Sequence, residues 1–332
     1  MRFTPTIAAA GLISAAAFVT PALAQTKTIT IDGSSTVFPV SEAIAEEFQK
    51  LMKNQVRVTV GISGTGGGFK KFCRGETDIS NGSRPILKSE IDDCKKAGIE
   101  FIEMPLAFDA LTVAVSPKNN FIGECITIAD LKKIWEPAAQ GKVLNWSDVN
   151  PKWPNQKMSL FGAGSDSGTF DYFTEAVTGK AKASRGDFTA SEDDNVLVQG
   201  IEKDANSLGY IPYAYYEPHQ KQMKALAIDG GKGCVKPSLE AVQGGKYNPL
   251  GRPLFIYVSK KSADKPEVQQ YVEFAMTKGP ALVAEVKYLA LPQIAYDDAF
   301  KHFKARRVGS VFGGVPEVGV SIEELMKRDA KS

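Results

Sequence analysis

The chain has 332 residues, of which 43% are hydrophobic, 23% charged and 9% aromatic. These fractions are typical of a globular protein and exclude a disordered, collagen-like or coiled-coil chain. Forty basic and 38 acidic residues give a net charge of +2, so no net field attracts nucleic acid or an anionic membrane. We therefore expect no nucleic-acid partner, and an anionic ligand would depend on local donors. The length predicts two lobes, at about 150 residues per domain.

The first 24 residues are typical of a secretory signal peptide. Arg2 precedes an uncharged apolar run at 7–23, which closes on the A-x-A motif Ala22-Leu23-Ala24. The alternative is a membrane anchor, which the short run and its polar interruptions disfavour. We expect cleavage before Gln25 and export of the remaining chain, in which no later stretch is long and apolar enough to span a membrane.

The first part of the exported chain alternates strands, small-residue loops and helices. A β-like run at residues 28–31 leads into the loop 33–36, and apolar residues then recur at helical spacing over 40–51. Residues 56–60 alternate as a half-buried strand does, and residues 61–68 form a predicted loop with five glycines. Such alternation predicts an α/β fold with mainly parallel strands.

The middle and the end of the chain repeat this scheme. Strands are predicted at 111–115 and 254–258, and helices at 128–135 and 266–287. A short strand also precedes the loop 162–169, and a further helix follows that loop.

Two of the predicted strands are candidates for crossovers between lobes, at 108–115 and 252–259. Lobe 1 would then be discontinuous, and lobe 2 would be inserted into it. Lobe 1 is predicted to comprise residues 25–110 and 256–332, and lobe 2 residues 111–255. Two such lobes with a cleft between them make a clamp for a small ligand. A linear division into two domains is the alternative.

Four cysteines follow the predicted cleavage site, and export makes disulfides the default for them. They allow three pairings. We favour Cys73–Cys94 and Cys125–Cys234, because each pair then lies within one predicted lobe. A metal site is disfavoured, because the chain has no C-x-x-C spacing and only two histidines.

Four short loops combine glycine with hydroxyl side chains, and three of them directly precede a predicted helix. They are residues 33–36 (GSST), 63–68 (SGTGGG), 81–85 (NGSRP) and 165–169 (SDSGT). A helix N-terminus has unpaired N–H groups and a partial positive charge. Hydroxyl donors and a close backbone approach then make an anion site without net charge. The alternative for each single loop is ordinary N-capping and turn formation.

Charged residues in these loops add specific chemistry. The guanidinium of Arg84 would hold an oxyanion through two parallel hydrogen bonds, unless it forms a surface salt bridge. Asp166 and Asp171 flank the fourth loop, as helix caps or as acceptors for a proton-bearing oxygen. Such an acceptor would select a protonated oxyanion over sulfate, because a carboxylate facing an unprotonated anion leaves both groups unpaired.

Several catalytic motifs are excluded. The second loop matches neither a P-loop nor G-x-G-x-x-G, and Asp166 stands where a nucleophile elbow needs serine. A Ser-His-Asp hydrolase is disfavoured, because neither histidine lies near a serine-rich loop in the sequence. We therefore expect a binding protein without catalytic residues.

The loops resemble those of a known family, the PstS-type phosphate-binding proteins of bacterial phosphate ABC transporters, which have the type II periplasmic-binding-protein fold. The matching segments occur in the family's order and span nearly the whole exported chain. They are 33–39 (GSSTVFP), 64–70 (GTGGGFK), 78–86 (DISNGSRPI), 167–170 (SGTF) and 208–215 (LGYIPYAY).

The resemblance implies a periplasmic protein whose two lobes close on inorganic phosphate and deliver it to the permease subunits of an ABC transporter. No cofactor is implied, and we expect a monomer. Carried over loop by loop, the phosphate contacts would be Ser35, Thr36, Val37, Ser63, Thr65, Ser83, Arg84, Ser167, Gly168 and Thr169. Other oxyanions, such as sulfate, molybdate or a phosphonate, stay open, as does a secreted hydrolase of phosphate esters.

One departure from the family pattern concerns the charged residues. The best-known branch has Asp after the serine of the third loop and Arg a few residues before S-G-T. Here Arg84 occupies the first position, and Ala163 or its neighbours occupy the second. The carboxylate that accepts the ligand's proton is therefore open, and Asp166 is our candidate.

Overall fold

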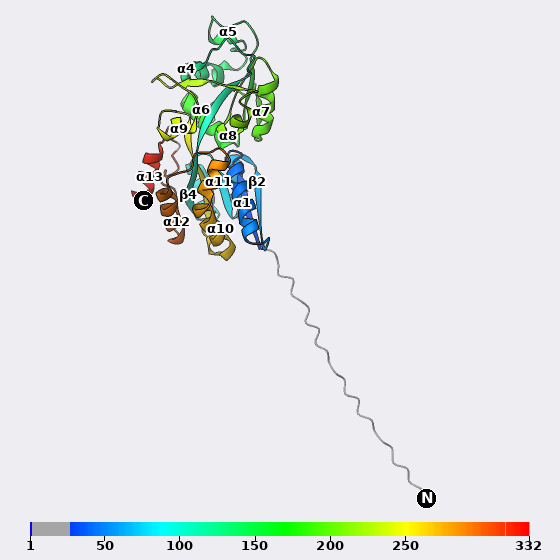
Figure 1. Cartoon of the computed structure of the whole chain (residues 1–332), viewed down its shortest axis with the longest axis vertical. Coiled ribbons are helices and arrows are strands. Elements are labelled where there is room, and N and C mark those ends of the chain that lie inside the picture. The colour runs from blue at the N-terminus through cyan, green and yellow to red at the C-terminus, as the bar shows by residue number, and fades with distance from the viewer. Residues whose placement is uncertain (2–26, 316, 332) are drawn as a thin grey trace.

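The computed structural model describes residues 1, 27–315 and 317–331. The predicted signal peptide, residues 1–24, lies outside the described residues apart from Met1. No helix in the described part of the chain combines the length and the hydropathy needed to cross a membrane. The chain forms a two-lobe α/β fold, with one lobe above the other along the longest axis (Figure 1).

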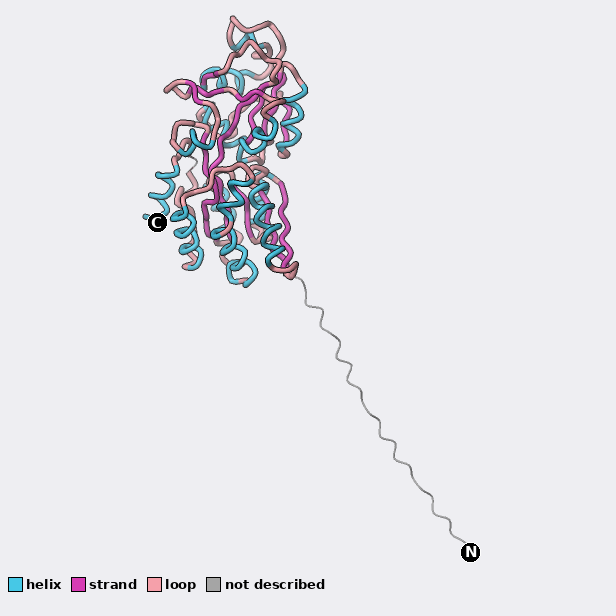
Figure 2. The backbone as a smooth tube through the Cα atoms, in the orientation of Figure 1, coloured by secondary structure: helices cyan, strands magenta, loops and turns pink. Residues whose placement is uncertain are grey.

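One large mixed sheet runs through both lobes, and Figure 2 shows its strands in magenta. The strand order is β2 (Val56–Ile62), β1 (Lys27–Gly33), β3 (Ile79–Gly82), β12 (Gly251–Ser259), β4 (Phe101–Val115), β8 (Ser207–Pro212), β6 (Ser159–Ala163) and β7 (Thr189–Ser191), with β9 (Lys224–Ala225) on β4. The outer strands pair in parallel, β1 with β2 and β3, and β6 with β7 and β8. The sheet is mixed rather than mainly parallel, because β4 and β12 run antiparallel to each other and to β8 and β3.

Strand β4 passes from one lobe to the other. Its first part, through Ala110, pairs with β12, and its last part, from Leu111, pairs with β8. Every residue of β4 and β12 is buried. Asp109 faces Arg252 in this ladder, where the pairing of β4 changes. The pairing of β4 therefore changes within the segment 108–115, one of the two predicted crossovers. The crossover at 252–259 and the lobe boundaries at 110/111 and 255/256 stay predictions.

The lower lobe holds β1–β3 and the helices that pack around them. These helices are α1 (Phe38–Leu51), α2 (Gly64–Phe72), α3 (Lys88–Lys96), α10 (Pro266–Thr277), α11 (Gly279–Glu285) and α12 (Gln293–Lys304), with α13 (Ile322–Lys331) against α12. Helix α1 buries Val40, Ile44 and Phe48, whose spacing predicts it. The single helix predicted over 266–287 is divided before Gly279, because Pro280 would clash with a preceding carbonyl in a continuous helix.

The upper lobe holds β6–β8 and a second, small sheet. Its helices are α4 (Ile128–Trp135), α5 (Trp146–Val149), α6 (Gly168–Thr178), α7 (Asp194–Lys203), α8 (Tyr213–Tyr216) and α9 (Leu239–Gln243). The small sheet has the order β11 (Cys234–Val235), β10 (Ala227–Asp229), β5 (Cys125–Thr127). Short 3₁₀ turns lie at Pro137–Ala139, Glu217–His219 and Ser262–Asp264.

The glycine-rich segment 61–68, predicted as a loop, is partly helical. Helix α2 begins at Gly64, so three consecutive glycines lie in its first turns. A Cβ at Gly68 would lie 2.5 Å from the Cα of Gly33, and one at Gly66 would lie 3.4 Å from the carbonyl oxygen of Asp166. The glycines therefore let the N-terminus of α2 approach both β1 and the upper lobe. This close tertiary packing outweighs the low helix propensity of glycine.

Both predicted disulfides are present, Cys73–Cys94 and Cys125–Cys234. The first joins the C-terminus of α2 to α3, and the second joins β5 to β11 across the small sheet.

Removing each disulfide by a double Cys→Ser substitution is expected to destabilise the protein, by an amount that rises with the logarithm of the length of the loop it closes. The separations are 21 residues for Cys73–Cys94 and 109 for Cys125–Cys234. The chain-entropy model gives losses of about 3 and about 5 kcal/mol. Urea unfolding of the two variants measures the difference, and a larger loss for the Cys73–Cys94 pair would contradict this account.

Candidate functional site

Four chain segments meet where the two lobes face each other. They are the turn before α1, the N-terminus of α2, the turn after β3 and the loop before α6. Parallel strands β1 and β3 end at the same edge of the sheet, which brings the segments after them together. Gly33 makes this possible, since its φ is +142° and a Cβ would lie 2.4 Å from the carbonyl oxygen of Asn81. These segments are the four glycine- and hydroxyl-containing loops of the sequence.

Four buried hydroxyl groups gather around the first turn of α6. The Oγ1 atoms of Thr36 and Thr169 lie 2.9 Å apart across the lobes, and Thr65 Oγ1 lies 3.1 Å from Ser83 Oγ. A Cβ at Gly168 would lie 2.4 Å from Thr65 Oγ1 and 2.5 Å from Ser83 Oγ. The lower lobe therefore presents its hydroxyls directly to the N-terminus of α6.

The helix N-termini at this place add partial positive charge. Neither α1 nor α2 has a side-chain hydrogen bond at its N-cap. Helix α6 is capped by Ser167, whose Oγ accepts a hydrogen bond of 3.1 Å from the backbone N–H of Thr169. Three helix N-termini aimed at one small region favour an anion there.

A buried guanidinium lies among the hydroxyls. Arg252 is fully buried, and its Nη2 donates to Thr36 Oγ1 at 3.1 Å and to Thr169 Oγ1 at 3.0 Å. Its Nε and Nη2 also donate to Asp109 Oδ2, at 3.1 and 2.9 Å, and its Nη1 lies 3.4 Å from the carbonyl oxygen of Ser83. One arginine thus contacts threonines of both lobes.

Sequence reasoning missed Arg252 and its partner. The loops drew attention to their own residues, whereas Arg252 and Asp109 belong to apolar strands far from S-G-T in the chain. A usable signal did exist, because one charge of each sign lies inside the two predicted crossover strands. Charges are seldom fully buried unless they are paired.

Burial governs the electrostatics of this region. It raises the pKa of the Asp109 carboxyl, against the opposing effect of the Arg252 charge. Burial also raises the pKa of Asp194 to about 7, with Ser35 and Arg252 acting in the opposite direction. Charge interactions are strong in such dry surroundings, so an anion would interact strongly with the guanidinium.

Arg84 lies beside the hydroxyl cluster, and two carboxylates already pair with its guanidinium. Its Nε donates to Asp171 Oδ2 at 2.7 Å, and its Nη1 and Nη2 donate to the two carboxylate oxygens of Glu90 at 2.9 and 2.8 Å. Its Nη1 also donates to the carbonyl oxygen of Pro85 at 3.0 Å. The bond to Asp171 joins the lobes, because Arg84 belongs to the lower lobe and Asp171 to α6.

Two further predicted residues have charged partners of their own. The Asp166 side chain is 40% exposed and accepts from Lys70 at 2.8 Å, while its carbonyl oxygen accepts from the N–H of Gly66 at 2.8 Å. Ser63 is half-buried, and its hydroxyl donates to Asp32. Asp166 therefore lies at the edge of the contact between lobes.

The other predicted residues are buried near the start of α1. Val37 precedes the first residue of α1 and is fully buried. Ser35 is also buried, and its carbonyl oxygen accepts a hydrogen bond of 3.1 Å from the Tyr215 hydroxyl of the upper lobe. Both lobes therefore hold this turn.

The donor set suits a small oxyanion. Among the described residues, no group of three or more His, Cys, Asp or Glu side chains is arranged to hold a metal ion. The site instead offers hydroxyls, backbone N–H groups and a guanidinium, all of which donate hydrogen bonds to anion oxygens.

Comparison with known proteins gives concordant matches. A family model described as a PBP superfamily domain matches residues 19–278. The chain is 50% identical over 309 residues to the protein SphX of Synechococcus elongatus, which covers 93% of this chain and 90% of that protein. It is 38% identical over 272 residues to the phosphate-binding protein PstS of Staphylococcus saprophyticus, with 80% and 81% covered. The crystal structure of a possible phosphate binding protein from Planctomyces limnophilus has 46% identity and a TM-score of 0.63, with 85% of this chain and 99% of that chain covered.

Proposed function

The chain belongs to the PBP superfamily, among the phosphate-binding proteins of the PstS and SphX type, and from this premise we propose how it captures inorganic phosphate for an ABC transporter. The observation that carries the mechanism is the pair of hydrogen bonds from Arg252 to Thr36 and Thr169, which belong to opposite lobes. A tetrahedral anion placed here would accept from all three groups and hold the lobes together.

The proposed phosphate contacts are donors from both lobes. They comprise the hydroxyls of Thr36, Thr65, Ser83 and Thr169, the Ser35, Val37 and Gly168 segments at helix N-termini, and the Arg252 guanidinium. Phosphate would replace the hydroxyl–hydroxyl contacts of 2.9 and 3.1 Å, so that each hydroxyl donates to an anion oxygen. The other predicted residues hold the segments that carry these donors, through the contacts described above. They are Ser63, Arg84, Asp166 and Ser167.

The setting of this function is the periplasm. The A-x-A motif near residue 24 and two disulfides support export to an oxidising compartment. We propose that phosphate shifts the lobes toward a closed form, which the permease subunits then recognise. The family consists of substrate-binding proteins, and we propose that this chain likewise has no catalytic role and acts as a monomer.

Calorimetric titration of refolded, ligand-free protein tests the function. Phosphate and arsenate are expected to bind at one site per chain, whereas sulfate and molybdate are expected to bind far more weakly. Tighter binding of sulfate or molybdate would assign the protein to another oxyanion.

A colorimetric phosphatase assay, with and without zinc or magnesium, tests the hydrolase alternative. We expect no release of phosphate from an ester above the blank. Release that saturates with ester concentration would contradict a purely binding role.

A further inference from the structure

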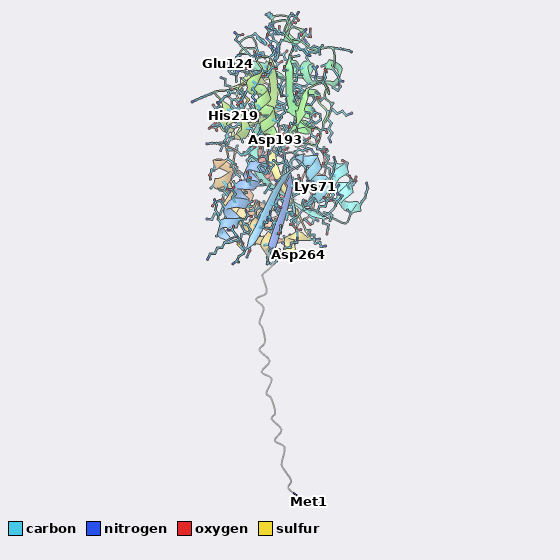
Figure 3. All side chains as sticks on the ribbon, turned by 90° about the vertical axis from the view of Figure 1, so that its right-hand side faces the viewer. Met1, Lys71, Glu124, Asp193, His219 and Asp264 are labelled. Atoms are coloured by element: carbon cyan, nitrogen blue, oxygen red, sulfur yellow. A yellow bond between two sulfur atoms is a disulfide. The ribbon has the colours of Figure 1, made fainter. Side chains whose placement is uncertain are left out.

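Glu192 follows β7 and holds the loop before α6 at the place where that loop meets the lower lobe. It is half-buried, and its Oε1 accepts a hydrogen bond of 3.1 Å from the backbone N–H of Asp166. The carbonyl oxygen of Asp166 in turn accepts from the N–H of Gly66 in α2, at 2.8 Å. Glu192 therefore fixes loop 165–169 at the residue that contacts the other lobe. Figure 3 labels the next residue, Asp193, where the two lobes meet.

The second carboxylate oxygen of Glu192 is enclosed at the same junction. Its Oε2 is buried and has no hydrogen-bond partner among the described residues. A Cβ at Gly64, the first residue of α2, would lie 2.7 Å from Oε2, and a Cβ at Gly164 would overlap Oε1. The carboxylate thus lies between a glycine of each lobe. No N–H group at the start of α2 donates to Oε2, so the helix supplies no donor in place of water.

The charged groups around Glu192 leave its carboxylate charge poorly compensated. Burial is the main cause that raises the pKa of Glu192, and the carboxylates of Asp166 and Asp171 act in the same direction. The Asp166 N–H and the ammonium of Lys70 act in the opposite direction, but Lys70 is more than half exposed and pairs with Asp166. Tyr210 of β8 stays neutral, because burial raises its own pKa well above the ordinary value. The charged form of Glu192 is therefore disfavoured while the lobes are in contact.

We propose that Glu192 is a positioning residue for phosphate capture, which holds loop 165–169 through Oε1 and whose unpartnered charge opposes closure of the lobes. This inference rests on the proposed function. When the lobes separate, Gly64 moves away with α2, and water reaches Oε2 again. Closure therefore removes water from a charged oxygen and supplies no donor in return, a cost that phosphate binding has to exceed. Glu192 thus limits how tightly the closed form holds phosphate.

Substitution with glutamine tests the effect of the charge. Glu192→Gln keeps an oxygen that accepts from the Asp166 N–H, so calorimetric titration at about pH 7.5 should show phosphate binding about 3- to 10-fold tighter than in the wild type. This advantage should disappear as the pH falls to about 4.5, because protonation then neutralises Glu192 in the wild-type protein. Phosphate changes its own protonation equally for both proteins, so the ratio of the two affinities isolates Glu192.

Two further variants serve as matched controls. Glu192→Ala also removes the charge but leaves the Asp166 N–H without its acceptor, so it should bind phosphate about 10-fold more weakly than Glu192→Gln. Asp193→Asn removes a charge from the adjacent exposed residue, which caps α7 by accepting from the N–H of Asn195 at 2.9 Å, and should bind phosphate as the wild type does.

Thermal unfolding checks that each variant is folded. The affinity of Glu192→Ala relative to the wild type should fall with pH in the same way as that of Glu192→Gln. This trend keeps the test of the charge valid if Glu192→Gln does not fold.

The outcomes separate this inference from the function beneath it. Wild-type protein that binds phosphate, together with a Glu192→Gln variant of equal or weaker affinity near neutral pH, would overturn the effect of the charge. Equal affinities of Glu192→Gln and Glu192→Ala would overturn the positioning role. A gain in Asp193→Asn as large as that in Glu192→Gln would assign the effect to overall charge and overturn the inference. Wild-type protein that binds no phosphate would overturn the proposed function as well.

Discussion

Substituting Arg252 with lysine is expected to weaken phosphate binding by about 100-fold or more, the largest loss of affinity for any single conservative change. Lysine keeps the positive charge opposite Asp109, but its ammonium is a single point. It cannot keep the paired contact that Nε and Nη2 make with Asp109 Oδ2 while also donating to Thr36 and Thr169, as the planar guanidinium does. Calorimetric titration with phosphate measures the loss, and thermal unfolding monitors the fold.

Arg185 provides a matched control for this substitution. It is a buried arginine of the upper lobe, 3% exposed, that donates to Asp187 and to the carbonyl oxygens of Ile134 and Val143. Arg185→Lys should lower the melting temperature yet leave phosphate affinity at the wild-type value. Equal losses of affinity in both variants would show that Arg252 acts only through stability.

Removal of the Arg84 guanidinium is expected to produce the largest loss of stability of the single substitutions proposed here. Arg84→Met keeps the apolar stem but leaves the carboxylates of Asp171 and Glu90 without their partner. Breaking such a buried pair costs about 3–5 kcal/mol. The free energy of unfolding in urea is the direct measurement.

The control for Arg84 is Arg74, whose pair with Glu76 lies on the surface. Arg74→Met should leave the free energy of unfolding nearly unchanged, because water screens an exposed pair. An Arg84→Met variant of wild-type stability that has lost phosphate binding would contradict the structural role. It would support instead the direct phosphate contact that the sequence suggested.

Local patterns sufficed for much of the fold. The helical spacing of Val40, Ile44 and Phe48 predicts α1, and the helix predicted over 128–135 is α4. Both disulfides followed from assigning cysteines to lobes, and four glycine- and hydroxyl-containing loops indicated where the donors would gather. The helices and the loops each depend on residues close together in the chain, whereas the Cys125–Cys234 disulfide joins residues 109 positions apart and followed only from the division into lobes.

Features that depend on distant partners could not be predicted in this way. Gly64–Gly68 is helical because of the tight approach to Gly33 and Asp166, which no local propensity encodes. Arg84 has a partner in the other lobe, Asp171, which lies 87 residues away, and Arg252 contacts Thr36 across 216 residues. Hence the charge at the centre of the proposed site was attributed to the arginine of a conspicuous loop.

A crystal structure of the protein with bound phosphate is the most direct test of the central claim. We predict one anion between the lobes, within hydrogen-bond distance of the Thr36 and Thr169 hydroxyls and of the Arg252 guanidinium. A phosphate ion held elsewhere, with the Thr36–Thr169 contact still in place beside Arg252, would contradict the account.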